Sequence, residues 1–265
     1  MQFQCPSARI YAHRYYPGFR GKYEQELDGW AMAKDFVAES RLNQADESSL
    51  ISEALNLFLV LHCDHGRGNV SASAASQIAS AHSNVAQALA GACAGLAGPR
   101  HGLASQQALE FVDSVIEKCG ANLTAEAVDA VIQAHKGPIP GIGHAVLRVT
   151  DPRYTALVEF ATKHGYAGKR LQAVRFIEDA ARKKLSGKAS SPNPNVDLAS
   201  GSVMCIGEFD KTEFQTALFF LSRAIGVGAQ IVIDRMLGVP ITRPYEVTLD
   251  SLIHPENASS QTAYD

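Results

Sequence analysis

Three residues that can transfer protons stand near breaks between predicted helices: His101, His144 and Asp197. Each comes shortly after glycine or proline, which interrupt helices and leave side chains at loop boundaries. A carboxylate base paired with a histidine donor can remove a proton next to a carbonyl group and stabilise the enolate. A second histidine can polarise the carbonyl that accepts the new bond. Together the three residues indicate carbon–carbon bond chemistry, provided that the fold brings them together.

Four further residues are candidates for binding an anion: His65, Arg153, Arg223 and Arg243. The guanidinium group of arginine recognises a carboxylate through two parallel hydrogen bonds. Arg223 is the most informative of the four, because its neighbours between residues 219 and 225 are mostly apolar and a buried arginine needs an anionic partner. With the proton-transfer residues, these cations indicate chemistry on a keto di-acid.

Every candidate also has a simpler interpretation that the residues alone leave open. Asp197 can merely cap the helix that follows it, and Arg153 can pair with Asp151. An ordinary place in a loop, at a helix start or on the surface is the alternative for the others: His65, His101, His144 and Arg243.

The spacing of apolar residues predicts an all-α fold with many helices. Residues 70–97 are rich in alanine and serine, so we expect two closely packed helices there, separated at residues 82–84 with Ser83 as the N-cap and ended by Pro99. Alternating patterns that indicate strands are scarce. Further helices are predicted at 50–59, 103–118, 124–135 with Thr124 as its cap, 154–163 and 170–185, then one from Val196 that carries Cys205 and two around Gly226 within 211–237.

Composition argues against several classes of protein. The chain has 265 residues, a formal net charge of −3 and 46% hydrophobic residues, so no basic surface favours nucleic acid or an anionic membrane. The one basic run, Arg182 to Lys184, is interpreted as a solvated helix end. The five cysteines are scattered with no C-x-x-C pair, which argues against a disulfide framework and a structural zinc site and favours a reducing compartment. No transmembrane span or targeting segment is visible, so we expect an intracellular protein, in the cytoplasm or the mitochondrion.

Several short sequence motifs, in their order and at their spacing, resemble those of the citrate synthase family, particularly of its branch in mitochondria and some bacteria. The resemblance covers most of the chain, and several motifs in order are far more specific than any one of them. The motifs are Asp64–Ala72, Gly95–Ala104, Pro140–Arg148, Thr150–Tyr154, Pro194–Asp197, Ser222–Val227 and Arg243–Pro244.

The resemblance implies a role for each matched residue. Asp197 is similar to the base that takes the α-proton of the acyl thioester, His101 to the residue that hydrogen-bonds the thioester oxygen, and His144 to the acid that polarises the oxaloacetate carbonyl. Arg243 is similar to an arginine supplied by the other subunit of a homodimer. Matches to oxaloacetate ligands are His65, Arg153 and Arg223; matches to the coenzyme A contacts are Pro140, Gly141, Ile142, Gly143, Arg148 and Asn195; and Phe219 matches an aromatic residue beside the reacting carbons.

The resemblance also implies an architecture and a reaction. It implies a large helical domain of residues 1–101 with 205–265 and a small domain of residues 102–204, together forming a multi-helical citrate synthase-like fold. The reaction implied is condensation of acetyl-CoA or a longer acyl-CoA with oxaloacetate, giving citrate or an alkylcitrate, with no cofactor beyond the thioester substrate and no metal. A citryl-CoA lyase and a truncated, catalytically silent family member are the alternatives.

The chain departs from the family pattern in several places. Family members begin well before this chain does, so we expect an N-terminally shortened member. Arg100 stands where an apolar residue is usual, Ser105 and Gln107 replace an asparagine and a glutamate, and residues 198–201 read Leu-Ala-Ser-Gly in place of Ala-His-Ser-Gly. These departures motivate the hypothesis that the acyl group is not acetyl.

Overall fold

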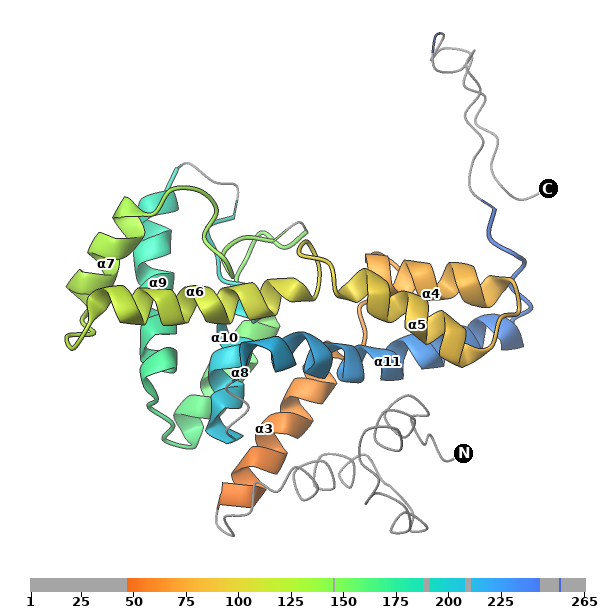
Figure 1. Ribbon diagram of the computed structural model, residues 1–265, viewed down its shortest axis with the longest axis horizontal. Coiled ribbons are helices and arrows are strands. Elements are labelled where there is room, and N and C mark those ends of the chain that lie inside the picture. The colour runs from red at the N-terminus through yellow and green to blue at the C-terminus, as the bar shows by residue number, and fades with distance from the viewer. Residues whose placement is uncertain (1–46, 145, 188–190, 208–210, 244–252, 254–265) are drawn as a thin grey trace.

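The computed structural model describes residues 47–144, 146–187, 191–207, 211–243 and 253, and this part of the chain is helical (Figure 1). It contains no strand, and its single isolated bridge joins Ile142 to Pro194. The predicted all-α fold is thereby confirmed. The helices are α3 (Glu47–His62), α4 (Val70–Ser80), α5 (Val85–Leu96), α6 (Leu103–Cys119), α7 (Ala125–Ala134), α8 (Pro152–Lys163), α9 (Lys169–Leu185), α10 (Val196–Met204), the 3-10 turn η2 (Cys205–Gly207) and α11 (Thr212–Met236).

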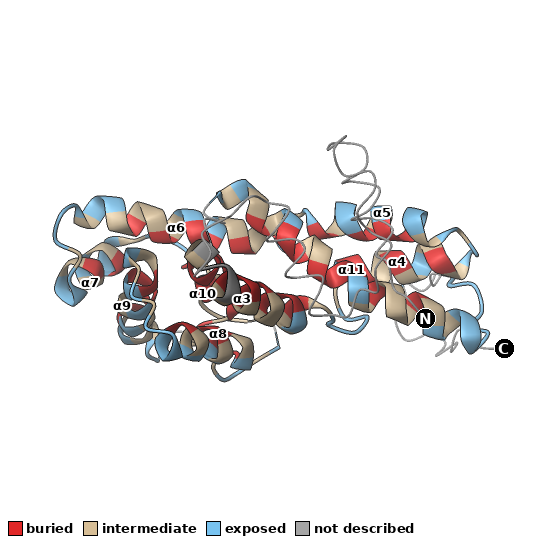
Figure 2. Cartoon of the chain, turned by 90° about the horizontal axis from the view of Figure 1, so that it is seen from below, coloured by how far each residue is buried: buried red, intermediate tan, exposed pale blue. Residues whose placement is uncertain are grey.

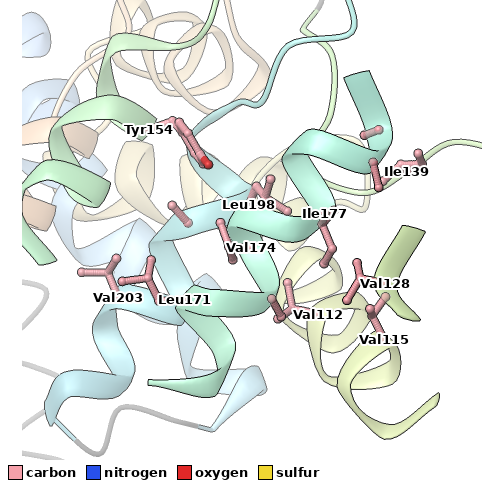
Figure 3. Packing of buried hydrophobic residues seen from close by; sticks show 14 of the residues in the cluster. Val112, Val115, Val128, Ile139, Tyr154, Leu171, Val174, Ile177, Leu198 and Val203 are labelled. Carbon is pink, nitrogen blue, oxygen red and sulfur yellow. The ribbon is translucent and has the colours of Figure 1, made fainter. Parts of the chain in front are cut away.

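The largest hydrophobic core lies among the five helices from α6 through α10 (Figure 3). Valine, leucine and isoleucine recur on the inner faces of α6, α7 and α9, and these faces close around α10. Gly201 lets α10 approach α6 closely, because an added Cβ would lie 3.0 Å from a methyl group of Leu109. This packing fixes α10, the helix that carries Asp197. Fully buried members of the core include Val112, Val115, Leu157, Val174, Ile177 and Val203.

Two smaller cores lie along α11, which passes α3 and reaches the antiparallel pair α4 and α5 (Figure 1). Large side chains such as Phe58 and Leu218 fill the core between α3 and α11. Alanines such as Ala75 and Ala88 fill the core of α4, α5 and α11, as their sequence predicted. Figure 2 shows buried residues along α3 and α10 at the middle of the molecule and exposed residues on the outer turns of α7 and α9.

The prediction of two helices around Gly226 is wrong, because α11 continues unbroken through it. Gly226 is instead a contact point with the C-terminal end of α3. Its amide lies 3.1 Å from the carbonyl oxygen of Cys63, and an added Cβ would be 2.2 Å from that oxygen. The absence of a side chain therefore serves helix packing, not a helix break.

Helix caps match the sequence in part. Thr124 caps α7 by accepting a hydrogen bond from the amide of Ala127, as predicted. The cap of α5 is Asn84 and not Ser83, since Asn84 and Gln87 bond each other's backbone amides in a capping box. Helix α10 ends at Met204, so Cys205 lies in the turn that follows it.

Helix α11 is the one described helix whose length and apolar composition would suffice to cross a membrane. It packs on α3, α4, α5 and α6 and buries Phe219, Val227 and Ile231 against them, which is the behaviour of a long core helix. The division into domains at residues 101/102 and 204/205 stays a prediction.

Candidate active site

Asp197 lies in the first turn of α10, but it does not cap the helix. Asn195 does so, because its side-chain oxygen accepts the amide of Asp197 at 3.0 Å. The capping interpretation of Asp197 is therefore wrong. Burial raises the pKa of Asp197 to about 6, and the charge of Arg153 acts in the opposite direction. A carboxyl group with such a pKa is a competent general base near neutral pH.

Asn195 also ties the predicted coenzyme A loop to the start of α10. Its side-chain amide donates to the carbonyl oxygen of Gly143 at 2.7 Å, and its backbone amide donates to the carbonyl oxygen of Gly141 at 2.9 Å. Gly141 has a φ of +79°, and an added Cβ there would lie 2.6 Å from Cβ of Leu198. Residues 141–143 are thus held against the first turn of α10, which carries Asp197.

Asp151 is a buried carboxylate that organises the same region. It binds the guanidinium of Arg153 through two hydrogen bonds of 2.7 and 3.1 Å and accepts the amide of Val196, the first residue of α10, at 3.2 Å. Burial disfavours its ionisation, but the hydrogen bonds and charge of Arg153 outweigh burial and hold the pKa of Asp151 below its usual value. The predicted pairing of Arg153 with Asp151 is confirmed, and the pairing fixes Arg153 beside Asp197.

Arg223 is 1% exposed and projects from the middle of α11. Its Nε donates to the carbonyl oxygen of His62 at 2.9 Å, and Ser222 and Gly226 bond the neighbouring carbonyl oxygens of Leu59 and Cys63. These contacts satisfy the carbonyl groups at the C-terminal end of α3.

The rest of the Arg223 guanidinium has no hydrogen-bond partner among the described residues. Its Nη1 and Nη2 are buried without a hydrogen-bond partner in the described chain, and its Cζ lies 4.8 Å from the centre of the Phe219 ring. Burial, followed by the charge of Arg153, lowers the pKa of Arg223 to about 10. A buried cation with two free donors is suited to bind an anion.

His101 lies just before α6 and is partly buried. Its Nε2 is 2.8 Å from the hydroxyl oxygen of Ser71, and that hydroxyl is 2.7 Å from the side-chain oxygen of Asn69. In this geometry Ser71 donates its single hydroxyl proton to Asn69. If the hydroxyl turns to His101, the neutral imidazole accepts that proton at Nε2, carries its own on Nδ1 and can donate it to a ligand. Burial lowers the pKa of His101 to about 4, with further contributions from Arg223 and His65. The imidazole is therefore neutral at physiological pH.

Phe219 is packed between the ring systems of the site. The His101 ring stands edge-on to the Phe219 ring, with 6.0 Å between the ring centres. The His62 ring also stands edge-on to it, with 5.0 Å between the ring centres. His62 is fully buried, donates from Nδ1 to the carbonyl oxygen of Phe58 at 2.9 Å, and has no described partner at Nε2. Sequence reasoning missed both His62 and Ser71, although helical spacing from Phe58 puts His62 on the buried face of α3.

His144 lies at the end of the loop that Asn195 holds. Its Nδ1 accepts the amides of Val146 and Leu147 at 3.0 and 2.9 Å, so the neutral ring carries its proton on Nε2. Burial lowers the pKa of His144, and Asp151 opposes the shift. Arg148 follows on the same loop, exposed, with its guanidinium on the carbonyl oxygen of His144 at 3.1 Å.

The charges of Arg153 and His65 act on several of the candidate residues. Arg153 lowers the pKa of Arg223 and acts on Asp197 and His144. His65, although exposed, lowers the pKa of both His101 and His144. Ring contacts or charge effects on pKa thus link seven of the predicted residues: His65, His101, His144, Arg153, Asp197, Phe219 and Arg223.

Arg243 does not join this site within one chain. It is exposed and follows Thr242, whose amide bonds the hydroxyl of Ser80 at the end of α4. The 13 residues that follow Arg223 on α11, up to Met236, extend about 20 Å along the helix axis, and Thr242 bonds the end of α4 beyond it, so Arg243 lies at the far end of that helix.

Comparison with known proteins gives the family. The sequence matches the family described as citrate synthase, C-terminal domain, over residues 2–245.

The chain belongs to the citrate synthase family.

Similar proteins include the mitochondrial citrate synthase of Fragaria ananassa, 41% identical over 207 residues, which cover 76% of this chain and 44% of that protein. The mitochondrial 2-methylcitrate synthase of Yarrowia lipolytica is 38% identical over 245 residues, 90% of this chain and 51% of that protein. The chain thus spans about half the length of these curated relatives.

Solved structures give the same fold. Citrate synthase from Thermoplasma acidophilum, in complex with carboxymethyl coenzyme A and oxaloacetate, is similar with a TM-score of 0.64 and 27% identity over 82% of this chain and 56% of that chain. The citryl-CoA lyase of Hydrogenobacter thermophilus has a TM-score of 0.67 and 23% identity over 88% of this chain and 84% of that chain. The lyase supports the fold alone.

Proposed function

We propose that this protein condenses an acyl-CoA with oxaloacetate, giving citrate or a 2-alkylcitrate and free coenzyme A. The observation that carries the proposal is Arg223, a buried guanidinium whose two terminal NH2 groups, Nη1 and Nη2, have no hydrogen-bond partner among the described residues. Arg153 lies close enough to depress its pKa. Two cations facing one site suit a substrate with two carboxylates, which is what oxaloacetate presents.

The first half of the reaction follows from the states of Asp197 and His101. The ionised carboxylate of Asp197 takes a proton from the carbon next to the thioester carbonyl. The neutral imidazole of His101 hydrogen-bonds the thioester oxygen as it becomes the enol oxygen. Burial favours a neutral donor at this position, so the oxygen receives a hydrogen bond without a strong positive charge beside Arg223.

The second half forms the carbon–carbon bond. The enol carbon attacks the keto carbon of oxaloacetate, and the ketone oxygen takes the Nε2 proton of His144 and becomes the hydroxyl group. Asp197 then gives up the proton it took from the thioester, and transfer of that proton through water to Nε2 of His144 restores both residues. Water then attacks the citryl thioester, the C–S bond breaks, and coenzyme A leaves as the thiol. Arginines supply the positive charge in this proposal, so it includes no metal and no cofactor other than the thioester substrate.

Coenzyme A is assigned to the loop held by Asn195. Backbone groups of Pro140, Gly141, Ile142 and Gly143 would lie along its arm, and Arg148 would meet its phosphates. The hydrogen bonds of Asn195 to Gly141 and Gly143 support this role, because they fix the loop beside Asp197.

We propose that the protein acts as a homodimer, in which Arg243 of each subunit completes the site of the other subunit. Its exposure at the far end of α11 supports this. Exposed apolar residues surround that end and suit a second copy of the chain: Ile233, Met236, Leu237 and Ile241. Because the similar synthases carry mitochondrial names, the proposal places the protein inside the cell, in the mitochondrion. Sedimentation of the isolated chain tests the assembly, and a strictly monomeric protein with full activity would contradict it.

The acyl group is proposed to be larger than acetyl. The similarity to a 2-methylcitrate synthase supports this, as do the unusual residues around His101. Ser105 is buried and bonds the carbonyl oxygen of Gly102 at 3.0 Å, whereas Arg100 and Gln107 are exposed. A panel of acyl-CoAs assayed by thiol release tests the substrate, and turnover of acetyl-CoA alone would exclude a larger acyl group. Cleavage of citryl-CoA without net synthesis would favour the lyase alternative, and an inactive dimer would favour the silent one.

A further inference from the structure

Arg182 on α9 belongs to the basic run that sequence analysis interpreted as a solvated helix end, yet it bonds inward. Its Nη1 donates to the side-chain oxygen of Asn193 at 2.5 Å, and its Nη2 donates to the hydroxyl of Thr150 at 2.9 Å. Thr150 belongs to the loop that follows His144, and Asn193 belongs to the loop before α10. One guanidinium therefore joins the two loops that carry the candidate site.

Asn193 passes this connection on to the predicted coenzyme A loop. The side-chain NH2 group of Asn193 donates to the backbone carbonyl oxygen of Arg148 at 3.1 Å. The backbone carbonyl oxygen of Asn193 accepts the amide of Gly143 at 2.8 Å. Asn193 thus bonds Arg182 through one end of its side chain and residues 143 and 148 through its other groups. Any displacement of Asn193 moves both anchors of the loop.

Glu178 fixes the orientation of Arg182, and Tyr154 in turn holds Glu178. Glu178, one turn earlier on α9, accepts Nη2 of Arg182 at 3.0 Å and also accepts the hydroxyl of Tyr154 at 2.5 Å. Burial, together with Glu178, raises the pKa of Tyr154, so the phenol remains a donor. The guanidinium is held in one geometry with its fork directed at the loops.

The oxaloacetate side of the site is held without Arg182. Asp151 binds Arg153 directly and accepts the amide of Val196, and its own amide donates to the carbonyl oxygen of Pro194 at 3.1 Å. Loss of Arg182 leaves these three contacts in place. The support of Arg153 and of the start of α10 is therefore separate from the support of residues 143–148.

We propose that Arg182 is a positioning residue that acts through Asn193 to hold residues 143–148 in the geometry that binds the coenzyme A portion of the acyl-CoA. This inference rests on the proposed function, because it concerns the acyl-CoA side of that reaction.

The test is steady-state kinetics of the Arg182→Ala variant of the full chain, with each substrate varied in turn. KM for the acyl-CoA is expected to rise about tenfold, the factor that one hydrogen bond from a charged donor contributes. KM for oxaloacetate is expected to stay within about twofold, because Arg153 keeps its support, whereas kcat is expected to fall as well, because His144 lies within residues 143–148. Equal rises in both KM values, or no rise in the acyl-CoA KM, would overturn the inference.

Arg175→Ala is the matched control. Arg175 is exposed on the same helix and bonds the hydroxyl of Thr162 at 2.6 Å, and so contacts neither loop. Its kinetic constants are expected to equal those of the wild type. Asn193→Ala should reproduce the acyl-CoA KM of Arg182→Ala, and the double variant should be no worse than either single one. Additive losses would contradict action through Asn193.

Hydrogen exchange separates this inference from the proposed function. Wild-type protein that releases no thiol from any acyl-CoA would refute the proposed function, and the loop geometry would still be measurable. The amide of Gly143, bonded to Asn193, is expected to exchange faster in Arg182→Ala and unchanged in Arg175→Ala. Unchanged protection of Gly143 in folded Arg182→Ala would refute the positioning role whatever the activity.

Discussion

Replacing Gly226 by alanine tests the contact that seats α11 on the end of α3. An ideal Cβ at residue 226 would lie 2.2 Å from the carbonyl oxygen of Cys63, 2.9 Å from its carbonyl carbon and 2.8 Å from Cβ of Asp64. Two of these atoms are backbone, so no rotamer change relieves the overlap. The helices must separate by roughly 1 Å to restore ordinary contact distances.

The magnitude follows from two opposing effects. Overpacking against a rigid neighbour costs about 1–3 kcal/mol, and a backbone clash lies at the upper end of that range. Alanine in a helix is more favourable than glycine by about 1 kcal/mol. The net loss in the free energy of unfolding is therefore about 2 kcal/mol. The same separation would lengthen the hydrogen bond from Arg223 to His62, so KM for oxaloacetate should also rise.

Gly228 provides the control, since it lies two residues later on α11 and an added Cβ there meets nothing within 4 Å. Gly228→Ala is expected to gain about 0.5–1 kcal/mol from helix propensity alone. Urea unfolding, monitored by circular dichroism at one protein concentration, measures the free energy of unfolding of both alanine variants. Equal stability of the two alanine variants would refute the packing explanation of Gly226.

Three further outcomes are expected. The value of kcat/KM should fall about tenfold per pH unit below pH 6, because the raised pKa of Asp197 means that the base is protonated there; a flat profile between pH 5 and 7 would exclude Asp197 as the base. Arg223→Met should raise KM for oxaloacetate by about 10²-fold or more and leave the free protein no less stable in thermal unfolding, since a buried unpaired charge is removed; an unchanged KM would exclude Arg223 as a ligand. Ser71→Ala should lower kcat about tenfold by removing the partner that orients His101, and an isotope-labelled imidazole resonance that keeps its tautomer in this variant would contradict the orienting role.

The helices and their boundaries were largely predictable, because the residues that start or end a helix act locally. Pro99 and Thr124 act on their own neighbours, and the structure places helix boundaries close to them. The misassigned cap of α5 also has a local signal, since Gln87 stands at the third helical position after Asn84 and completes a capping box. Gly226 was misread because its partner, Cys63, is distant in the sequence.

The site was predictable where residue type and setting agree. Apolar neighbours indicated that Arg223 is buried, and it is. The inward bonds of Arg182 could not be predicted, because a long side chain at a helix end reaches solvent or a loop depending on where that loop returns. Ser71 and His62 were missed because their roles arise from contacts with other elements. The role proposed for Arg243 requires a second chain, which no pattern within one chain can position.

Thiol release by the wild type and by Asp197→Asn, with and without oxaloacetate, tests the central claim most directly. The account predicts that the wild type releases thiol from at least one acyl-CoA only when oxaloacetate is present, with a 2-alkylcitrate or citrate as product. The Asp197→Asn rate should be lower by about 10²–10⁴-fold, the usual loss for a general base. Thiol release that does not depend on oxaloacetate, or that survives in Asp197→Asn, would contradict it.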